Sequence, residues 1–336
     1  MNAFQVLLYT LWGFASGAVL ARYGRFRAWP SRTLALDEPL ALAEERTTRL
    51  RRLYANATRD AWDGEAVFRE AVARHGGIQA DRPRREALAR VLNLLLWGEL
   101  GAWTIAAELA ERLDDADARL AASSQVFDEA RHFYVLRDYM ALLHVPLPPL
   151  DPYFATGARW ILSSRDLTLK LLAMQILAEG AATAIFRILI QARVEPVLAD
   201  LLPFVEKDES RHVGLGVMHL PVLLGRASPR QLRRLRRRAI AIGNLIGAAN
   251  VRNNDAWRAL GLDPREVGRS IDRVVYELVR KLDLPGGEGF LPIQAPEGPT
   301  YERIQAVLVP ADGAPRPLVT RVFHRVLSAG ARLLPA

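Results

Sequence analysis

The stretch Asp128-Glu129-Ala130-Arg131-His132 occurs a second time, eighty residues later, as Asp208-Glu209-Ser210-Arg211-His212. A lone glutamate, Glu99 or Glu179, stands thirty residues before the glutamate of each copy. Residues three positions apart lie on one face of a helix, so the glutamate and histidine within each copy point the same way. The chain therefore offers four carboxylates and two imidazoles in a repeated pattern, which predicts a dinuclear metal site.

Folding each copy into an antiparallel helix pair brings its two glutamates to the same height. The midpoint of the first copy falls in the polar run Asp114-Asp115-Ala116-Asp117, which suits a turn. The midpoint of the second copy is Val194, and Glu195-Pro196 after it indicates a helix boundary. Each arm then has roughly 22 Å of helix. Two such hairpins would place all the ligands in one four-helix core.

The lone glutamates lie in apolar stretches of the sequence. Glu99 is inside residues 94–103 and Glu179 inside residues 174–183, both rich in Leu, Ala, Ile and Trp. An isolated carboxylate in such surroundings costs several kcal/mol or takes up a proton. A single Glu-x-x-His could be a surface pair on a charged helix, but two copies at matched spacing favour a metal.

These motifs resemble the ferritin-like di-iron carboxylate proteins, in which two helices give one Glu each and two give Glu-x-x-His. D-E-x-R-H in both halves resembles the oxygen-activating branch, which includes bacterial multicomponent monooxygenases, acyl-carrier-protein desaturases and ribonucleotide reductase small subunits. The resemblance covers about residues 85–225. It implies two iron ions (Fe²⁺ or Fe³⁺), with manganese as the alternative, O₂ as co-substrate, and Glu99, Glu129, His132, Glu179, Glu209 and His212 as ligands.

The same resemblance assigns the other residues of the motif. Asp128 and Asp208 would accept hydrogen bonds from the ligand histidines, and Arg131 and Arg211 would hold the two aspartates. This division is physically reasonable, because a ligand histidine usually needs a partner for its second ring nitrogen.

Departures from the pattern weaken two members of the branch. Ribonucleotide reductase small subunits carry a radical tyrosine four residues beyond the first ligand histidine, where this chain has Leu136. Their first ligand is usually aspartate, and here it is Glu99. Arylamine N-oxygenases add a third histidine where this chain has Val205.

Side chains at helical spacing from the ligands are mostly apolar, which predicts an apolar substrate beside the metals, although bundle core is the alternative for each. Thr183 matches a threonine that related monooxygenases are thought to use in oxygen handling, and it is the predicted catalytic residue. A threonine bonded to its own helix carbonyl is the alternative. The predicted substrate pocket comprises Leu95, Trp103, Phe133, Ile176, Phe186 and Val213.

Composition excludes several classes of protein. The 336 residues include no cysteine, so disulfides, zinc–thiolate sites and iron–sulfur clusters are excluded. The net charge of +8 suits an anionic membrane surface or an acidic partner. No aromatic-basic motif of a nucleic-acid module is present, so nucleic acid is not an expected partner. No flavin, nicotinamide or iron–sulfur pattern is present, so electrons are expected from a separate reductase or ferredoxin.

The N-terminus is uncharged from Asn2 to Ala21, and Arg22 follows. Such a segment is about long enough to span a bilayer, and the arginines after it would keep the body of the protein on the cytoplasmic side. A membrane anchor, a buried helix of the fold and a signal peptide all stay open.

The expected fold is all-α, a ferritin-like four-helix bundle with additional N- and C-terminal helices, because no stretch alternates like a strand. Prolines between residues 146 and 152 forbid helix and predict a crossover between the hairpins. A homodimer and a membrane contact stay open. The expected parts are 1–30, an apolar N-terminal segment; 31–83, accessory helices; 84–225, the bundle, with helices at 84–113, 117–144, 157–192 and 196–218; and 226–336, a helical extension.

The expected activity is hydroxylation or desaturation of an apolar substrate by an O₂-activating di-iron enzyme. The substrate would be a lipid-like or aromatic small molecule, or an acyl chain bound to a carrier protein. The alternative from another class is a ferritin-like ferroxidase or iron-binding protein without an organic substrate. The basic run at residues 230–238 is a solvated helix face or a contact for lipid headgroups or an acidic carrier.

Overall fold

A computed structural model describes residues 45–282, 291 and 295–309. Every regular element in this part of the chain is a helix, which confirms the all-α prediction. The predicted N-terminal segment, residues 1–30, lies outside the described residues.

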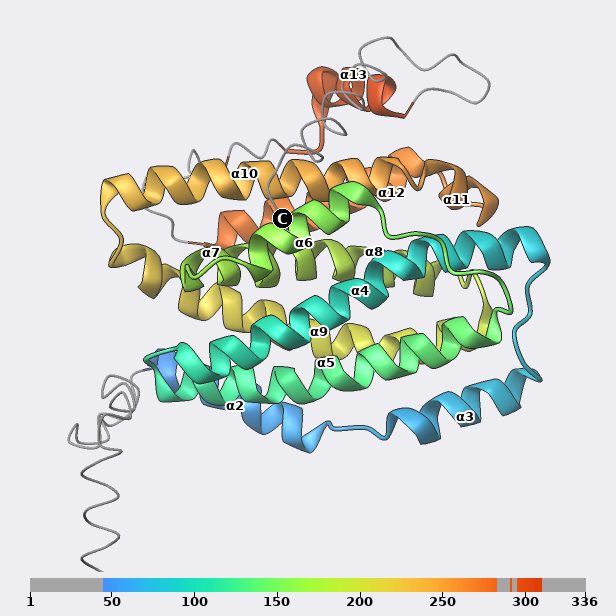
Figure 1. Ribbon diagram of the computed structural model, residues 1–336, viewed down its shortest axis with the longest axis horizontal. Helices are drawn as coiled ribbons and strands as arrows, with labels where there is room; N and C mark the ends of the chain where they lie inside the picture. The colour runs from blue at the N-terminus through green and yellow to red at the C-terminus, as the bar shows by residue number, and fades with distance from the viewer. Residues whose placement is uncertain (1–44, 283–290, 292–294, 310–336) are drawn as a thin grey trace, which may run out of the picture.

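The long helices form two antiparallel hairpins that pack side by side (Figure 1). The predicted turns are present at residues 113–115 and 192–195. Asp81, Asp115 and Glu195 cap the helices that follow them, because each side chain accepts a hydrogen bond from a backbone N–H in the first turn. The hairpins comprise α4 (Arg82–Arg112) with α5 (Ala116–Leu142), and α7 (Leu167–Leu171), η1 (Leu172–Ala178) and α8 (Glu179–Gln191) with α9 (Pro196–Gly225).

The single third helix predicted at 157–192 is wrong. The structure has a separate helix α6 (Pro152–Leu162), then a break at residues 163–166 before α7. Pro152 begins a helix because the first helical position needs no N–H donor, and Asp151 caps it. Asp166 caps α7 in the same way. The crossover between the hairpins therefore contains a helix of its own.

Further helices cover the bundle on opposite sides (Figure 1). Helices α2 (Glu45–Arg59) and α3 (Gly64–His75) contact α5 and α9. On the other side α10 contacts α6, and α12 contacts α8. The C-terminal helices are α10 (Pro229–Val251), α11 (Asn254–Ala259), α12 (Pro264–Lys281) and α13 (Gly298–Leu308).

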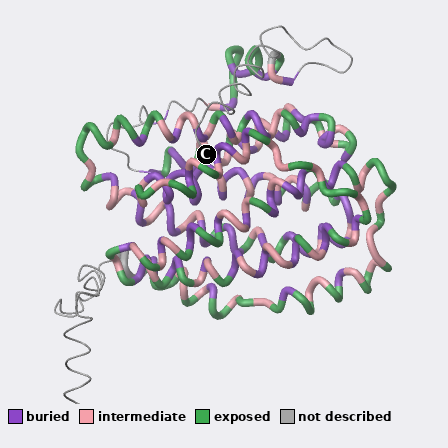
Figure 2. The backbone as a smooth tube through the Cα atoms, viewed as in Figure 1, coloured by how far each residue is buried: buried purple, intermediate pink, exposed green. Residues whose placement is uncertain are grey.

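Buried positions follow the inner faces of the bundle helices (Figure 2). Among the described residues, one stretch, Leu167–Gln191, is long and apolar enough to cross a membrane. Its most apolar window is 67% buried inside the protein. Its place in the core accounts for its apolar character.

Tyr139 joins the two hairpins away from the repeated motifs. Its hydroxyl donates to Oε2 of the fully buried Glu195 at 3.0 Å. We expect Tyr139→Phe to lower the free energy of unfolding by about 1.5–3 kcal/mol, because the buried carboxylate loses a donor. Urea denaturation measures this loss. Tyr134→Phe on the same helix is the control, and an equal effect of both changes would contradict the assignment.

Candidate metal centre

The structure brings the six predicted ligands together in the middle of the bundle. They form two groups of four, and within each group the ligand atoms lie within 4.8 Å of one another. Glu129 and Glu209 belong to both groups, whereas Glu99 and Glu179 each belong to one. All six side chains are buried. This is the arrangement expected for two metal ions bridged by two carboxylates and flanked by two others.

The shortest contacts in the centre join one copy of the motif to the other. Nδ1 of His132 lies 3.1 Å from Oε1 of Glu209, and Nδ1 of His212 lies 3.1 Å from Oε1 of Glu129. Nδ1 of His132 also lies 3.4 Å from Oε2 of Glu99. The ring nitrogens that face the centre are therefore both Nδ1.

The donor set fits two divalent metal ions. Oε2 of Glu129, Oε1 of Glu209 and Nδ1 of His132 are buried, and none makes a hydrogen bond within the described part of the chain. Buried polar atoms rarely stay without a partner, and a metal would supply one. The four glutamates carry four negative charges, which two divalent cations would neutralise. Carboxylate and imidazole are ligands that iron and manganese share.

Burial and mutual repulsion divide the four carboxyl groups into two kinds. Burial raises the pKa of Glu99 and of Glu179 well above its usual value, and the charges of Glu209 and Glu129 add to the rise for Glu179. Burial also acts to raise the pKa of Glu129, but His212 and His132 outweigh it, and the net pKa is well below the usual value. Contacts with Glu179 and the histidines lower the pKa of Glu209 to about 2, against the effect of burial.

The histidines respond in the opposite direction. Burial acts to lower the pKa of His132, but Asp208 and the glutamates raise it well above its usual value. Burial and the neighbouring carboxylates act on His212 in the same two ways, with the same net rise. Both shifts show how strongly the carboxylates attract positive charge, which is the electrostatic requirement for a cation site.

A ring of four charged side chains lies behind the histidines. Arg131 donates to both Asp128 and Asp208, with Nη2 2.7 Å from Oδ2 of Asp208, and Arg211 donates to the same two aspartates. The ring carries two positive and two negative charges, so it adds no net charge to the centre. Removing any one member would leave a buried charge without its partner.

The aspartates of the ring bind histidines of the opposite copy. Nε2 of His132 lies 3.0 Å from Oδ2 of Asp208, and Nε2 of His212 lies 3.3 Å from Oδ2 of Asp128. If Nε2 donates its proton to the aspartate, Nδ1 keeps a lone pair directed at the centre. The predicted roles of these aspartates stay predictions, but each contact that they need is present.

Trp62 is a residue that the sequence did not point to. Its indole Nε1 donates to Oδ2 of Asp208 at 2.8 Å, and Arg131 lies over its ring, 4.7 Å from the ring centre. It precedes α3, far along the chain from either motif. No spacing relates it to a ligand, so only the packing of α3 on α9 reveals it.

A π-helical turn places Glu179 in the centre. Within η1 the backbone hydrogen bonds span five residues, as between the N–H of Glu179 and the carbonyl of Met174. Gln175 in this turn donates to Gln125, which in turn donates to Glu129 at 2.8 Å. Helix α9 approaches the turn at Gly216, where an added Cβ would lie 2.5 Å from Cβ of Gln175. A larger side chain at Gly216 would therefore push the turn out of place.

Thr183 is buried in α8, four residues after Glu179. Its hydroxyl has no hydrogen-bond partner among the described residues, so it is not bonded to its own helix carbonyl. The predicted role in oxygen handling stays a prediction.

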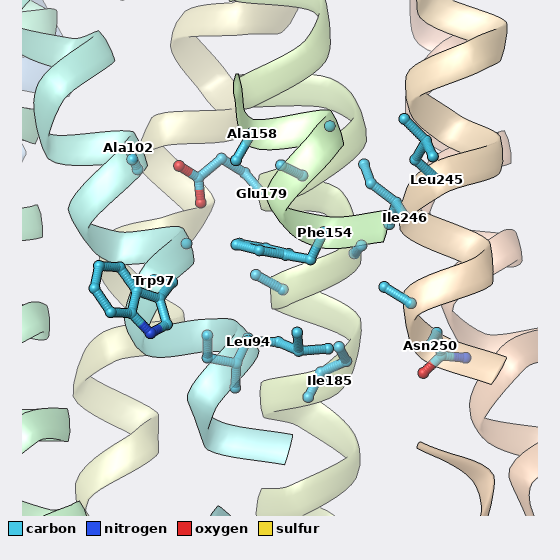
Figure 3. A pocket seen from close by; sticks show the side chains of 18 of the residues that line it. Leu94, Trp97, Ala102, Phe154, Ala158, Glu179, Ile185, Leu245, Ile246 and Asn250 are labelled. Carbon is cyan, nitrogen blue, oxygen red and sulfur yellow. The ribbon is translucent and has the colours of Figure 1, made fainter. Parts of the chain in front are cut away.

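An apolar cavity of about 130 Å³, here called the inner cavity, lies beside the centre. Glu99 and Glu179 are in its wall, and neither histidine is. In Figure 3 the ring of Phe154 lies between Glu179 and Ile185, and Ala102 and Ala158 flank the carboxylate. Helices α4, α6, α8 and α10 supply most of the wall. The inner cavity thus reaches the centre on its glutamate side.

Of the six residues predicted to line a substrate pocket, the structure places Leu95 in this wall. Ile176 and Phe186 are fully buried in the core, and Val213 packs against it. The rings of Trp103 and Phe133 lie 6.4 Å apart, on a different face from the cavity.

The π-turn explains part of this outcome. Counting three residues back from Glu179 along a regular helix gives Ile176, but the extra residue in the turn rotates the preceding segment. Met174 and Ala178 line the inner cavity in its place. The residues of α6, α10 and α11 in the wall, such as Phe154, Leu245 and Trp257, carry no spacing relation to a ligand.

Comparison with known proteins supports the fold. A solved structure from Bacillus halodurans, provisionally assigned as a class I ribonucleotide reductase, matches with a TM-score of 0.56 and 14% sequence identity. The match covers 70% of this chain and 93% of that chain. At this identity the likeness shows the fold alone, and the chain has the ferritin-like fold of di-iron carboxylate proteins. No family model and no curated protein sequence matches the chain.

Proposed function

We propose that this protein is an oxygen-activating di-iron enzyme that hydroxylates or desaturates an apolar substrate. The observation that carries the proposal is the inner cavity, which brings an apolar space directly to Glu99 and Glu179. An iron-storage or ferroxidase site needs access for ions, and an apolar wall does not provide it. When bound, the two iron ions would supply the binding and reduction of O₂.

The residues of this chain would hold the metals and keep water away from the substrate. Glu129 and Glu209 would bridge the ions, Glu99 and Glu179 would each bind one, and the two histidines would complete the set. Electrons would come from a separate reductase or ferredoxin. Manganese in place of iron is the alternative for the metal, since the ligands suit both.

A ribonucleotide reductase subunit is a weaker candidate, although the Bacillus halodurans protein carries that name. The position of the radical tyrosine in such subunits is occupied by the fully buried Leu136. The nearby Tyr139 donates to Glu195 and is not directed at the ligands. A desaturase acting on a carrier-bound acyl chain fits the inner cavity as well as a hydroxylase does.

The test is to load the purified protein with iron, reduce it without oxygen, and then add O₂ under optical and Mössbauer spectroscopy. We expect about two irons per chain that oxidise together to a magnetically coupled ferric pair. A single loosely bound ion, or none, would overturn the proposal. Release of oxidised iron into solution as mineral would favour the ferroxidase alternative.

Thr183→Val tests the predicted catalytic residue. Since the hydroxyl is buried without a partner, we expect the change to leave the free energy of unfolding equal or slightly higher. Metal content should also be unchanged. If the hydroxyl assists oxygen handling, oxidation of the reduced metals by O₂ should slow by about tenfold or more. Stopped-flow absorbance measures the rate, and an unchanged rate would remove Thr183 from the active site.

A further inference from the structure

The inner cavity is long and narrow. Its wall on α4 runs from Val91 to Ile105, which is roughly 21 Å at the helical rise of about 1.5 Å per residue. Its volume of about 130 Å³ is slightly less than the roughly 150 Å³ of an engineered cavity that holds one benzene ring. A space of that volume spread over that length suits an unbranched alkyl chain better than a ring system.

The carboxylates lie beside the middle of this space. Along α4, Glu99 is roughly 12 Å from Val91 and roughly 9 Å from Ile105. A chain lying along the cavity would therefore pass the centre with an interior carbon, and not with its end.

The far end of the inner cavity is a thin wall. A second cavity of about 260 Å³, here called the outer cavity, lies between α10, α12 and α13. The two cavities share four wall residues, of which Ile246 on α10 and Ile271 on α12 are the largest; the others are Ala181 and Asn250. Ile246 is only partly buried and packs against both halves of the core. The two isoleucines thus separate one cavity from the other.

We propose that the inner cavity binds an unbranched alkyl chain lengthwise and that Ile246 and Ile271 form the stop that sets its length. The substrate would then be an acyl or alkyl chain oxidised at an interior carbon, an assignment that rests on the proposed function. Removing the stop joins the two cavities and admits a longer chain.

The outer cavity can also be filled again by design. Gly243 on α10 lines it, and a Cβ added to Gly243 would meet nothing within 4 Å. A leucine at this position can therefore occupy the outer cavity without displacing its neighbours.

The experiment measures binding of a homologous series of straight-chain primary alcohols to the full-length, iron-loaded protein by calorimetry. In the native protein the affinity should rise about fourfold for each added methylene until the chain reaches the stop, and then cease to rise. In Ile246→Ala the rise should continue to longer chains. Ile271→Ala is the second variant and should act alike.

Two further variants complete the design. Ile190→Ala, which truncates a partly buried isoleucine outside both cavities, should keep the native length limit. Adding Gly243→Leu to Ile246→Ala should restore that limit. The stop is disproved if both alanine variants keep the native limit. If no alcohol binds while the oxygen reaction is intact, the alkyl-chain assignment falls and the proposed function stands.

Discussion

Glu209→Gln is expected to lower the metal content from about two ions per chain to less than about one. Glutamine keeps the size of the side chain but loses the charge and one ligand oxygen. Glu209 belongs to both groups of ligands, so its loss weakens both metal positions. Its pKa of about 2 shows that the native carboxylate is ionised at neutral pH, as a bridging ligand must be. Metal analysis after iron loading and gel filtration measures the effect.

Two matched variants make this result specific. Glu206→Gln changes a glutamate on the same helix whose carboxylate pairs with Arg187 near the surface, and it should keep the native metal content. Glu99→Gln removes a ligand from one group only and should retain about one ion per chain. If Glu209→Gln binds as much metal as Glu206→Gln does, the assignment of the bridging ligands is wrong.

The repeated motif was sufficient to predict the bundle and the ligand cluster. Burial, turn positions and antiparallel pairing all follow from one spacing, and helical geometry converts that spacing directly into distance. The pairing of each aspartate with the histidine of the other copy was not predictable, because it depends on how the two hairpins face each other. Trp62 was missed for the same reason.

The inner cavity was predictable only as an apolar space beside the ligands. Its wall comes largely from α6 and α10, whose packing on the bundle is not encoded in any spacing relative to the motif. The π-turn before Glu179 also changes which residues of the third bundle helix face the cavity. Counting along a regular helix therefore selected Ile176, which is in the core, and passed over Met174.

Asp208→Ala is expected to lower the free energy of unfolding by about 3–5 kcal/mol, even without metal. Oδ2 of Asp208 accepts from Trp62 at 2.8 Å and from Arg131 at 2.7 Å, and the carboxylate also contacts Arg211 and His132. Its removal leaves two buried guanidinium groups with one aspartate between them. Urea denaturation of the metal-free protein measures the loss.

Asp200→Ala is the matched control on the same helix. Asp200 also pairs with two cationic side chains, Arg74 and His75, but at a partly exposed position. Solvent screens such pairs, so we expect a loss of about 1 kcal/mol or less. A comparable loss for both aspartates would mean that the ring is no more than a set of surface-like ion pairs. A much larger loss for Asp208, seen before any metal is added, would show that the ring organises both histidines in the folded protein and so prepares the site for metal.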